Sequence, residues 1–170
     1  MKMSTKNLVK GAVIAALYTA LTYVAAAINL AYGGVQFRFS EALTILPVFT
    51  PAAIPGLTIG CLLSNALSPY PLDMLFGTAA SLLAAVGTYL LRNVKVKGVP
   101  VLAPLPPVIF NAVIIGAEIA FTMSEGFNWA NFFLFAFQVG LGQLVVCYVL
   151  GLPLYYAIEK SGAKRLIAER

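Results

Sequence analysis

The chain has 170 residues, of which 61% are hydrophobic and only 10% are charged, and its formal net charge is +5. Soluble domains carry about 25% charged residues, so this composition excludes a water-exposed surface over most of the molecule and indicates a membrane protein. One spanning helix needs roughly 20 apolar residues, which leaves room for about five or six spans and excludes a soluble domain of useful size.

The first span is predicted at about residues 8–30, and it ends at the turn signal Tyr32-Gly33-Gly34. Residues 35–38 alternate between apolar and polar side chains, which predicts a short extended loop. We expect this loop, at 32–38, to lie on the outer side of the membrane over a ligand cavity.

The next apolar stretch, 39–67, is long for one span and short for two. Its three prolines, Pro47, Pro51 and Pro55, decide between these alternatives. Proline removes a helix hydrogen bond and clashes with the preceding turn, so the stretch predicts two short helices at about 40–49 and 52–67.

The second half of the chain predicts three further spans. They cover about 72–91, 102–123 and 129–158, and they are separated by a polar loop at 92–100 and a turn at 124–128. We therefore expect an all-α membrane protein in which residues 1–170 form a single domain of six transmembrane helices in one bundle.

The basic residues predict the orientation. Ten of the eleven flank the spans: Lys2, Lys6, Lys10, Arg92, Lys95, Lys97, Lys160, Lys164, Arg165 and Arg170. Six spans place all ten on one side, which the positive-inside rule makes cytoplasmic together with both termini. Because these charges act as topology signals, we expect no nucleic-acid partner. Topology leaves only Arg38 unexplained.

Charged and amide side chains within or beside the spans are the candidate site. A charge at the centre of a spanning helix costs on the order of 2.5–3.5 kcal/mol, so it marks a polar partner or a water-filled cavity. The clearest case is Glu118, and Asn111 lies two turns earlier on the same predicted helix face. The substrate-binding candidates are Gln36, Phe37, Arg38, Glu41, Asn65, Asp73, Asn111, Glu118 and Gln138.

Structural alternatives remain open for most of these residues. Arg38 and Glu41 are three apart and suit a local ion pair at a helix start. Asp73 suits the first turn of a helix through the helix dipole, and Asn65 suits a helix-end cap. Asn111 and Glu118 suit a buried hydrogen bond between helices. Gln138 and Gln143 are five apart, so at most one of them is expected to face a ligand.

Two further patterns bear on the energy source. Small residues recur every fourth position at Ala12, Ala16 and Ala20, a spacing that lets helices approach closely in lipid. The chain has no GxxxxGK[ST] phosphate-binding loop, and six spans without a visible repeat are few for a self-sufficient carrier. These observations favour a binding subunit that takes its energy from a partner. With no histidine and no clustered cysteines, we expect no enzyme, no metal site and no cofactor.

At this point a resemblance is visible. The chain resembles the QueT family, whose members are substrate-binding S components of energy-coupling factor (ECF) transporters. The residues that carry the likeness are Val35-Gln36-Phe37-Arg38-Phe39-Ser40-Glu41-Ala42-Leu43, Pro51-Ala52-Ala53-Ile54-Pro55-Gly56-Leu57, Ile59-Gly60-Cys61-Leu62, Asn65, Leu72-Asp73 and Phe76-Gly77.

The resemblance implies a six-helix protein of the bacterial cell membrane that takes up a queuosine precursor, a 7-deazaguanine such as 7-aminomethyl-7-deazaguanine. It also implies a transmembrane coupling subunit with two ATPase subunits, and a docking surface for them at Ala12, Ala16 and Ala20. Glu41 or Glu118 would then meet the base edge, and Asp73 or the remaining glutamate would meet the ammonium group. The competing hypothesis is a stand-alone carrier coupled to protons or ions.

Overall fold

The computed structural model describes residues 4–32, 35–68, 70–123 and 127–167. In these ranges every regular element is helical, apart from an isolated bridge between Val96 and Val99. The elements are α1 (Thr5–Ala27), η1 (Phe39–Val48), α2 (Ala53–Asn65), α3 (Asp73–Leu90), η2 (Leu91–Asn93), α4 (Leu105–Met123), α5 (Trp129–Val145), η3 (Val146–Gly151), α6 (Leu152–Lys160) and α7 (Lys164–Ile167).

Four helical stretches of the described chain are long and apolar enough to cross a membrane. They are Thr5–Ala27, Asp73–Asn93, Leu105–Met123 and Trp129–Lys160, and the last joins α5, η3 and α6. Two shorter apolar helices, η1 and α2, lie between the first and second of these. The prediction of two short helices in the stretch 39–67 is therefore confirmed, with ends that shift by one or two residues.

The prolines lie where the apolar stretch 39–67 divides into two helices, as expected, but the first of these helices is a 3₁₀ helix rather than an α-helix. Pro51 lies between η1 and α2, and Pro55 lies in the first turn of α2, where its missing N–H leaves no helix hydrogen bond unmade. Pro47 lies inside η1, which is a 3₁₀ helix of ten residues. Runs of this helix type beyond three or four residues are uncommon, and this one persists in a fully enclosed position.

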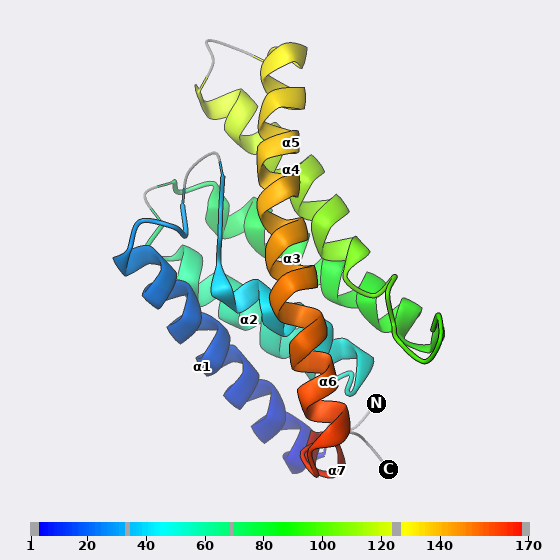
Figure 1. Cartoon of the computed structure of the whole chain (residues 1–170). Helices are drawn as coiled ribbons and strands as arrows, with labels where there is room; N and C mark the ends of the chain where they lie inside the picture. Colours follow the sequence, from blue (N-terminus) through cyan, green and yellow to red (C-terminus); the bar gives the residue numbers. More distant parts are fainter. Residues whose placement is uncertain (1–3, 33–34, 69, 124–126, 168–170) are drawn as a thin grey trace.

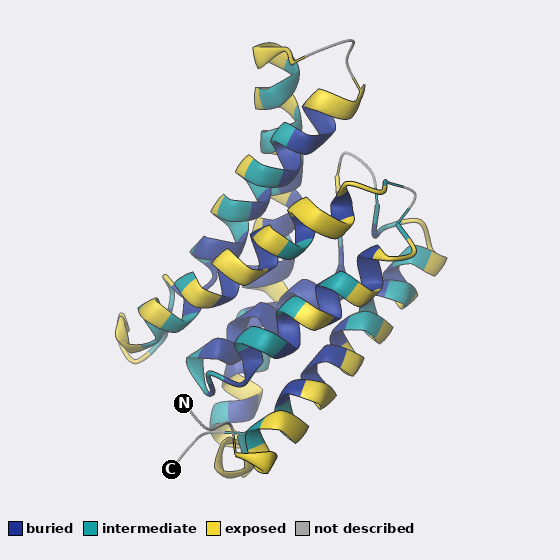
Figure 2. Cartoon of the chain, turned by 180° about the vertical axis from the view of Figure 1, so that it is seen from behind, coloured by how far each residue is buried: buried dark blue, intermediate teal, exposed yellow. Residues whose placement is uncertain are grey.

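Helix η1 lies at the centre of the bundle (Figure 1). Consecutive α-helices pack side by side, α1 on α2, α2 on α3, α3 on α4 and α4 on α5. Helix η1 contacts α1, α2, α3, η2, η3 and α6. All residues from Ser40 to Pro47 are buried. Figure 2 shows the same division, with buried residues toward the interior and exposed ones along the outer helix faces.

Small residues let α1 and α2 approach closely. A Cβ atom at Gly56 would lie 2.8 Å from the carbonyl oxygen of Gly11, and one at Gly60 would lie 2.8 Å from the Cβ of Tyr18. The hydroxyl of Thr19 also donates to the carbonyl oxygen of Gly60 at 3.2 Å. The close packing of α1 on α2 holds the face of α1 that carries Tyr18 toward the interior of the bundle.

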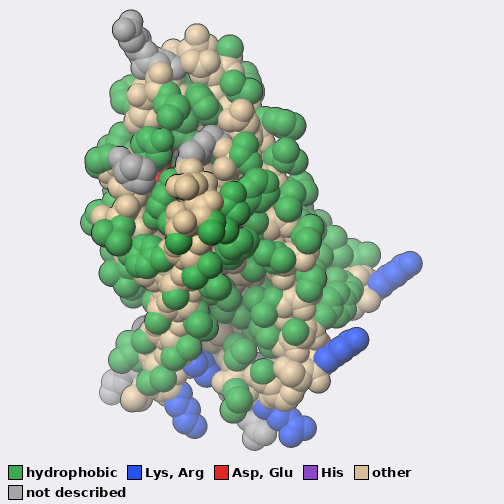
Figure 3. Space-filling model, turned by 60° about the vertical axis from the view of Figure 1, so that its left-hand side comes forward, with side chains coloured by type: hydrophobic (Ala, Val, Ile, Leu, Met, Phe, Trp, Pro, Cys, Tyr) green, Lys and Arg blue, Asp and Glu red, His purple; other side chains and the backbone are tan. Residues whose placement is uncertain are grey.

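The basic side chains gather at one end of the molecule (Figure 3). The Nζ of Lys10 donates to the carbonyl oxygen of Ile167 at 2.9 Å, so the first and last described helices meet there. The Nζ of Lys95 lies 6.0 Å from the ring centroid of Tyr155 at the same end. The rest of the face in Figure 3 is mainly hydrophobic, as a lipid-facing surface requires.

The last long stretch is continuous, as predicted for 129–158, but it contains a π-helical segment. Helix η3 comes directly before Pro153, the second residue of α6. Proline has no N–H to donate to the preceding turn, and a π segment is a common local adjustment in such a helix. The segment packs against η1, so the irregular backbone faces the interior.

Candidate functional site

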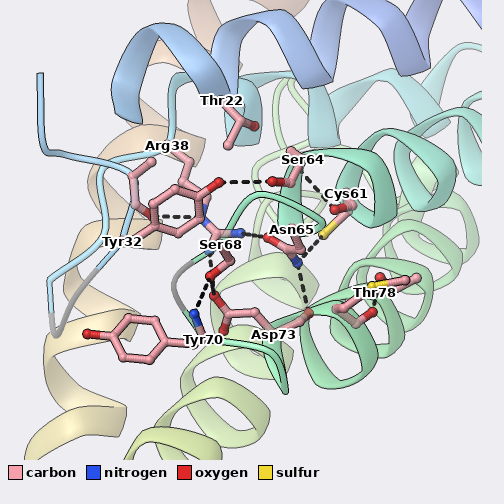
Figure 4. A network of polar contacts seen from close by, with 12 residues as sticks. Thr22, Tyr32, Arg38, Cys61, Ser64, Asn65, Ser68, Tyr70, Asp73 and Thr78 are labelled. Carbon is pink, nitrogen blue, oxygen red and sulfur yellow. Dashed lines mark hydrogen bonds and ion pairs between the residues drawn. The ribbon is translucent and has the colours of Figure 1, made fainter. Parts of the chain in front are cut away.

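Arg38 is the centre of a buried polar network (Figure 4). It directly precedes η1 with extended backbone angles, and its side chain is buried. Its Nε donates to the carbonyl oxygen of Ala31 at 2.8 Å, and its Nη1 donates to Oδ1 of Asn65 at 3.0 Å. Its Nη2 lies 3.5 Å from Oδ2 of Asp73. The guanidinium thus joins the segment after α1 to the end of α2 and the start of α3.

Asn65 and Asp73 each make several contacts within this network. The Nδ2 of Asn65 donates to the carbonyl oxygen of Asp73 at 2.9 Å and contacts Sγ of Cys61 at 3.3 Å. Oδ2 of Asp73 accepts from the hydroxyl of Ser68 at 2.6 Å. Asp73 is the first residue of α3, as the helix dipole favours, and its charge is also paired with Arg38. Both side chains therefore position the site.

Tyr32 closes the network toward the loop. Its hydroxyl donates to the carbonyl oxygen of Ser64 at 2.9 Å, and its ring centroid lies 5.1 Å from the guanidinium carbon of Arg38. Burial raises the pKa of Tyr32, so this hydroxyl stays protonated at neutral pH. Gly33 and Gly34, which belong to the predicted loop at 32–38, lie outside the described residues.

Glu41 does not pair with Arg38 in the local ion pair that the spacing allows. Its Oε1 accepts a short hydrogen bond from the hydroxyl of Tyr18 on α1. The side chain of Gln143 on α5 lies beside the same carboxyl group. Only 2% of the surface of Glu41 is exposed, and its Oε2 has no hydrogen-bond partner among the described residues. A buried carboxylate oxygen without a partner is costly, so this atom requires an explanation.

Glu118, on α4, is likewise a buried carboxyl group. It is 5% exposed, and within the part of the chain that the structure describes its Oε2 has no hydrogen-bond partner. Its carboxyl group interacts with that of Asp73, and the charge of Arg38 acts on it as well. Asn111 is buried on the same face of α4, as predicted, but its Nδ2 donates to the carbonyl oxygen of Pro107 in its own helix at 2.9 Å.

The extended segment 35–38 turns its polar residues inward. Gln36 and Arg38 are buried, whereas Val35 is exposed and Phe37 is half-buried. Successive side chains of an extended segment point to opposite sides, so Phe37 does not share the side of Arg38, and its contact with a ligand stays a prediction. The backbone of Gln36 packs closely on α5, since a Cβ at Gly142 would lie 2.4 Å from its carbonyl oxygen.

Of the two glutamines of α5, the structure brings Gln143 to the site. Gln138 is half-buried and lies one turn before Gly142, on the face of α5 that meets segment 35–38. Gln143 is buried, and its Oε1 lies 3.5 Å from Sγ of Cys147 in η3. The thiol of Cys147 also contacts the carbonyl oxygen of Glu41 at 3.7 Å. That at most one of the two glutamines faces a ligand stays a prediction.

Sequence reasoning missed Tyr18 and Ser68 and left Gln143 out of the candidate set. A signal existed for Tyr18, because it is the polar-tipped residue on the α1 stripe that also carries Ile14 and Thr22, and all three are buried. For Ser68 the only signal was its place before the proline-rich turn to α3. Both cysteines, Cys61 and Cys147, are buried and free.

The small residues Ala12, Ala16 and Ala20 lie on the outer face of α1. All three are exposed, whereas Gly11, Ile14, Ala15 and Tyr18 are buried on the opposite face. The spacing that predicted a close helix contact therefore leaves these alanines outside the bundle of this chain. The equivalent inner contact is made by Gly56 and Gly60 of α2.

The buried network contains one cation and three carboxyl groups: Arg38, Glu41, Asp73 and Glu118. Arg38 satisfies Asp73, and the other two acids each keep one oxygen without a partner. Desolvated carboxylates without a partner are unstable unless a hydrogen-bond donor or a cation meets them. The arrangement is therefore complementary to a small polar guest that is rich in N–H groups and carries positive charge.

The chain is similar to known proteins. The family model described as QueT transporter matches residues 8–160. The queuosine precursor transporter QueT of Lactococcus lactis subsp. cremoris (strain MG1363) is 38% identical over 81 residues, which cover 48% of this chain and 48% of that protein. The match thus spans about half the length of this curated relative. No solved structure matches.

Proposed function

Because the chain belongs to the QueT transporter family, we propose that it is the substrate-binding component of an importer for a queuosine precursor, a 7-deazaguanine such as 7-aminomethyl-7-deazaguanine. One observation carries the proposal: Glu41 and Glu118 are buried, and each keeps a carboxylate oxygen that no group of the described chain satisfies. A transported solute with several N–H donors is the partner that such oxygens require.

The ligand chemistry fits the charges of the site. The edge of a guanine-like base offers an amino group and a ring N–H side by side, and a carboxylate accepts such a pair of donors in parallel. The aminomethyl arm is a cation, and the three buried acids exceed the single buried Arg38. The network around Arg38, Asn65 and Asp73 then keeps the binding surfaces in place rather than meeting the ligand at every atom.

The membrane arrangement follows from the same proposal. Helices η1 and α2 would each count as a membrane crossing, which makes six crossings together with the four long helical stretches. The basic end of the molecule, where the start of α1 meets α7, would lie in the cytoplasm. Segment 35–38 and Tyr32 would then lie at the outer mouth of the site, since they are at the other end of α1. The solute would enter past this segment.

Energy would come from a transmembrane coupling subunit with two ATPases, as in ECF transporters. The exposed stripe of Ala12, Ala16 and Ala20 supports this part of the proposal, because small residues on a lipid-facing helix allow a partner helix to approach closely. Reconstituted vesicles distinguish the two hypotheses. Uptake that requires the coupling module and ATP supports an S component, whereas uptake by this chain alone supports an ion-coupled carrier.

Binding to the purified protein tests the central claim. Isothermal titration with 7-aminomethyl-7-deazaguanine should give saturable binding to the wild type. Glu41→Gln and Glu118→Gln should each lower the affinity by roughly 10-fold or more, because each removes a charge-assisted hydrogen bond. Wild-type affinity in both variants would contradict the assignment of these carboxylates to the ligand.

A further inference from the structure

The two unsatisfied carboxylates have different neighbours. Glu41 is surrounded by neutral polar groups, namely the hydroxyl of Tyr18, the amide of Gln143 and the thiol of Cys147 near its backbone carbonyl. Glu118 has another carboxyl group, Asp73, as its side-chain neighbour. Resting on the function proposed above, we infer that Glu41 binds the base edge of the deazaguanine and that Glu118, together with Asp73, binds its ammonium group.

The surroundings of Glu41 match the hydrogen-bonding pattern of the base edge. That edge presents an amino group, a ring N–H and a carbonyl oxygen in a row. Each carboxylate oxygen accepts two hydrogen bonds, so Oε1 of Glu41 retains capacity beside its bond from Tyr18, and Oε2 is unoccupied. An amide carries both a donor and an acceptor, so Gln143 is the neighbour suited to the carbonyl at the end of the row.

The surroundings of Glu118 match a compact cation. Two adjacent carboxyl groups disfavour each other's ionised form, and a positive charge between them relieves this repulsion. An ammonium group brings that charge and three donors. The amide on the same helix face, Asn111, is engaged with the carbonyl oxygen of Pro107. The hydroxyl of Thr122 is engaged with the carbonyl oxygen of Glu118 itself. Neither is arranged to read the carbonyl of a base.

Arg38 acts on both subsites through its charge. Its direct contacts are with Ala31, Tyr32, Asn65 and Asp73. Asp73 accepts from Ser68 and from Arg38, so its oxygens are partly engaged before a ligand arrives. The ammonium group would therefore form its shortest contact with Oε2 of Glu118 and interact with Asp73 through charge.

A pair of ligands separates this assignment from its reverse. 7-Aminomethyl-7-deazaguanine carries both the base edge and the ammonium group, and 7-methyl-7-deazaguanine carries the edge alone. The wild type should bind the aminomethyl compound roughly 10- to 100-fold more tightly, as expected for a charge-assisted contact in a buried site. The ratio of the two affinities then reports the ammonium subsite alone.

The two variants should change this ratio differently. Glu118→Gln should reduce the ratio to within about threefold of one and leave the affinity for 7-methyl-7-deazaguanine nearly unchanged. Glu41→Gln should weaken both ligands by roughly 10-fold or more and leave the ratio intact. If a Gln variant does not fold, Glu118→Met and Glu41→Met supply the same comparison, because an apolar side chain of similar volume is tolerated where a buried charge is removed.

The outcomes are distinct. If the affinity ratio falls to about one in the Glu41 variant and keeps its wild-type value in the Glu118 variant, the assignment is reversed. A ratio reduced equally in both variants would show that the two acids act as one subsite. If the wild type binds neither compound, the proposed function fails, and the division of roles fails with it. Tight and equal binding of both compounds by the wild type would retain a deazaguanine binder but refute an ammonium subsite.

Discussion

Removal of the Arg38 side chain should expose how strongly the centre of the site depends on one buried cation. Arg38→Met eliminates hydrogen bonds of 2.8 Å to Ala31 and 3.0 Å to Asn65 and the 3.5 Å ion pair with Asp73. Asp73 then loses its positive partner and keeps its hydrogen bond from Ser68. Leaving one partner of a buried ion pair uncompensated typically costs about 3–5 kcal/mol, so we expect a loss of unfolding free energy in that range.

A double-mutant cycle separates the ion pair from the other losses. Arg38→Met leaves the Asp73 carboxylate without its cation, and Asp73→Asn removes that negative charge. The double variant should therefore be more stable, by about 1–3 kcal/mol, than the sum of the two single losses predicts. Unfolding in mixed detergent micelles, followed by far-ultraviolet circular dichroism, measures all four proteins. Additive losses within about 0.5 kcal/mol would refute the ion pair as the link between segment 35–38 and α3.

Two further predictions concern the packing and hydrogen bonding of α1. Gly60→Val should destabilise the protein by about 1–3 kcal/mol, because the new Cβ would lie 2.8 Å from the Cβ of Tyr18. As a control, a Cβ at Gly162 meets nothing within 4 Å, so Gly162→Ala should leave the thermal midpoint unchanged. Equal midpoints for the two variants would contradict the close approach of α1 and α2. Tyr18→Phe should cost about 1–3 kcal/mol, because Oε1 of the buried Glu41 loses the hydrogen bond from the Tyr18 hydroxyl. Tyr23→Phe, which removes a hydroxyl from an exposed contact, should cost less, and an equal loss in both variants would assign no special role to the bond to Glu41.

The helical layout follows from local physics that the sequence carries. Long apolar stretches must form helices in lipid, because every backbone N–H and carbonyl needs a partner there. Three prolines within nine residues break such a helix, and the break falls between Val48 and Ala53. The 3₁₀ form of η1 had no such signal. All of its residues from 40 to 47 are buried, so no amphipathic period distinguishes one helix type from another.

The partners within the site depend on tertiary packing and were harder to predict. The spacing of Arg38 and Glu41 suits a local pair, but Arg38 lies just before η1, and its extended backbone directs the side chain toward the α2–α3 junction. Which of Gln138 and Gln143 faces the interior could not be predicted from the sequence for the same reason. Both lie in one apolar helix, and only the packing of η1 against η3 shows that Gln143 faces the interior.

The enclosed position of η1 has a consequence for how the binding specificity of this protein can change. The buried residues between Ser40 and Pro47 belong to a helix that contacts six neighbouring elements, so a new specificity gained by substitution there would also cost stability. Glu118 lies on α4, at the periphery of this arrangement. If Glu41 binds the base edge as proposed, descendants of this chain that accept a different solute arm should vary first on α4 and keep the central segment that carries Glu41.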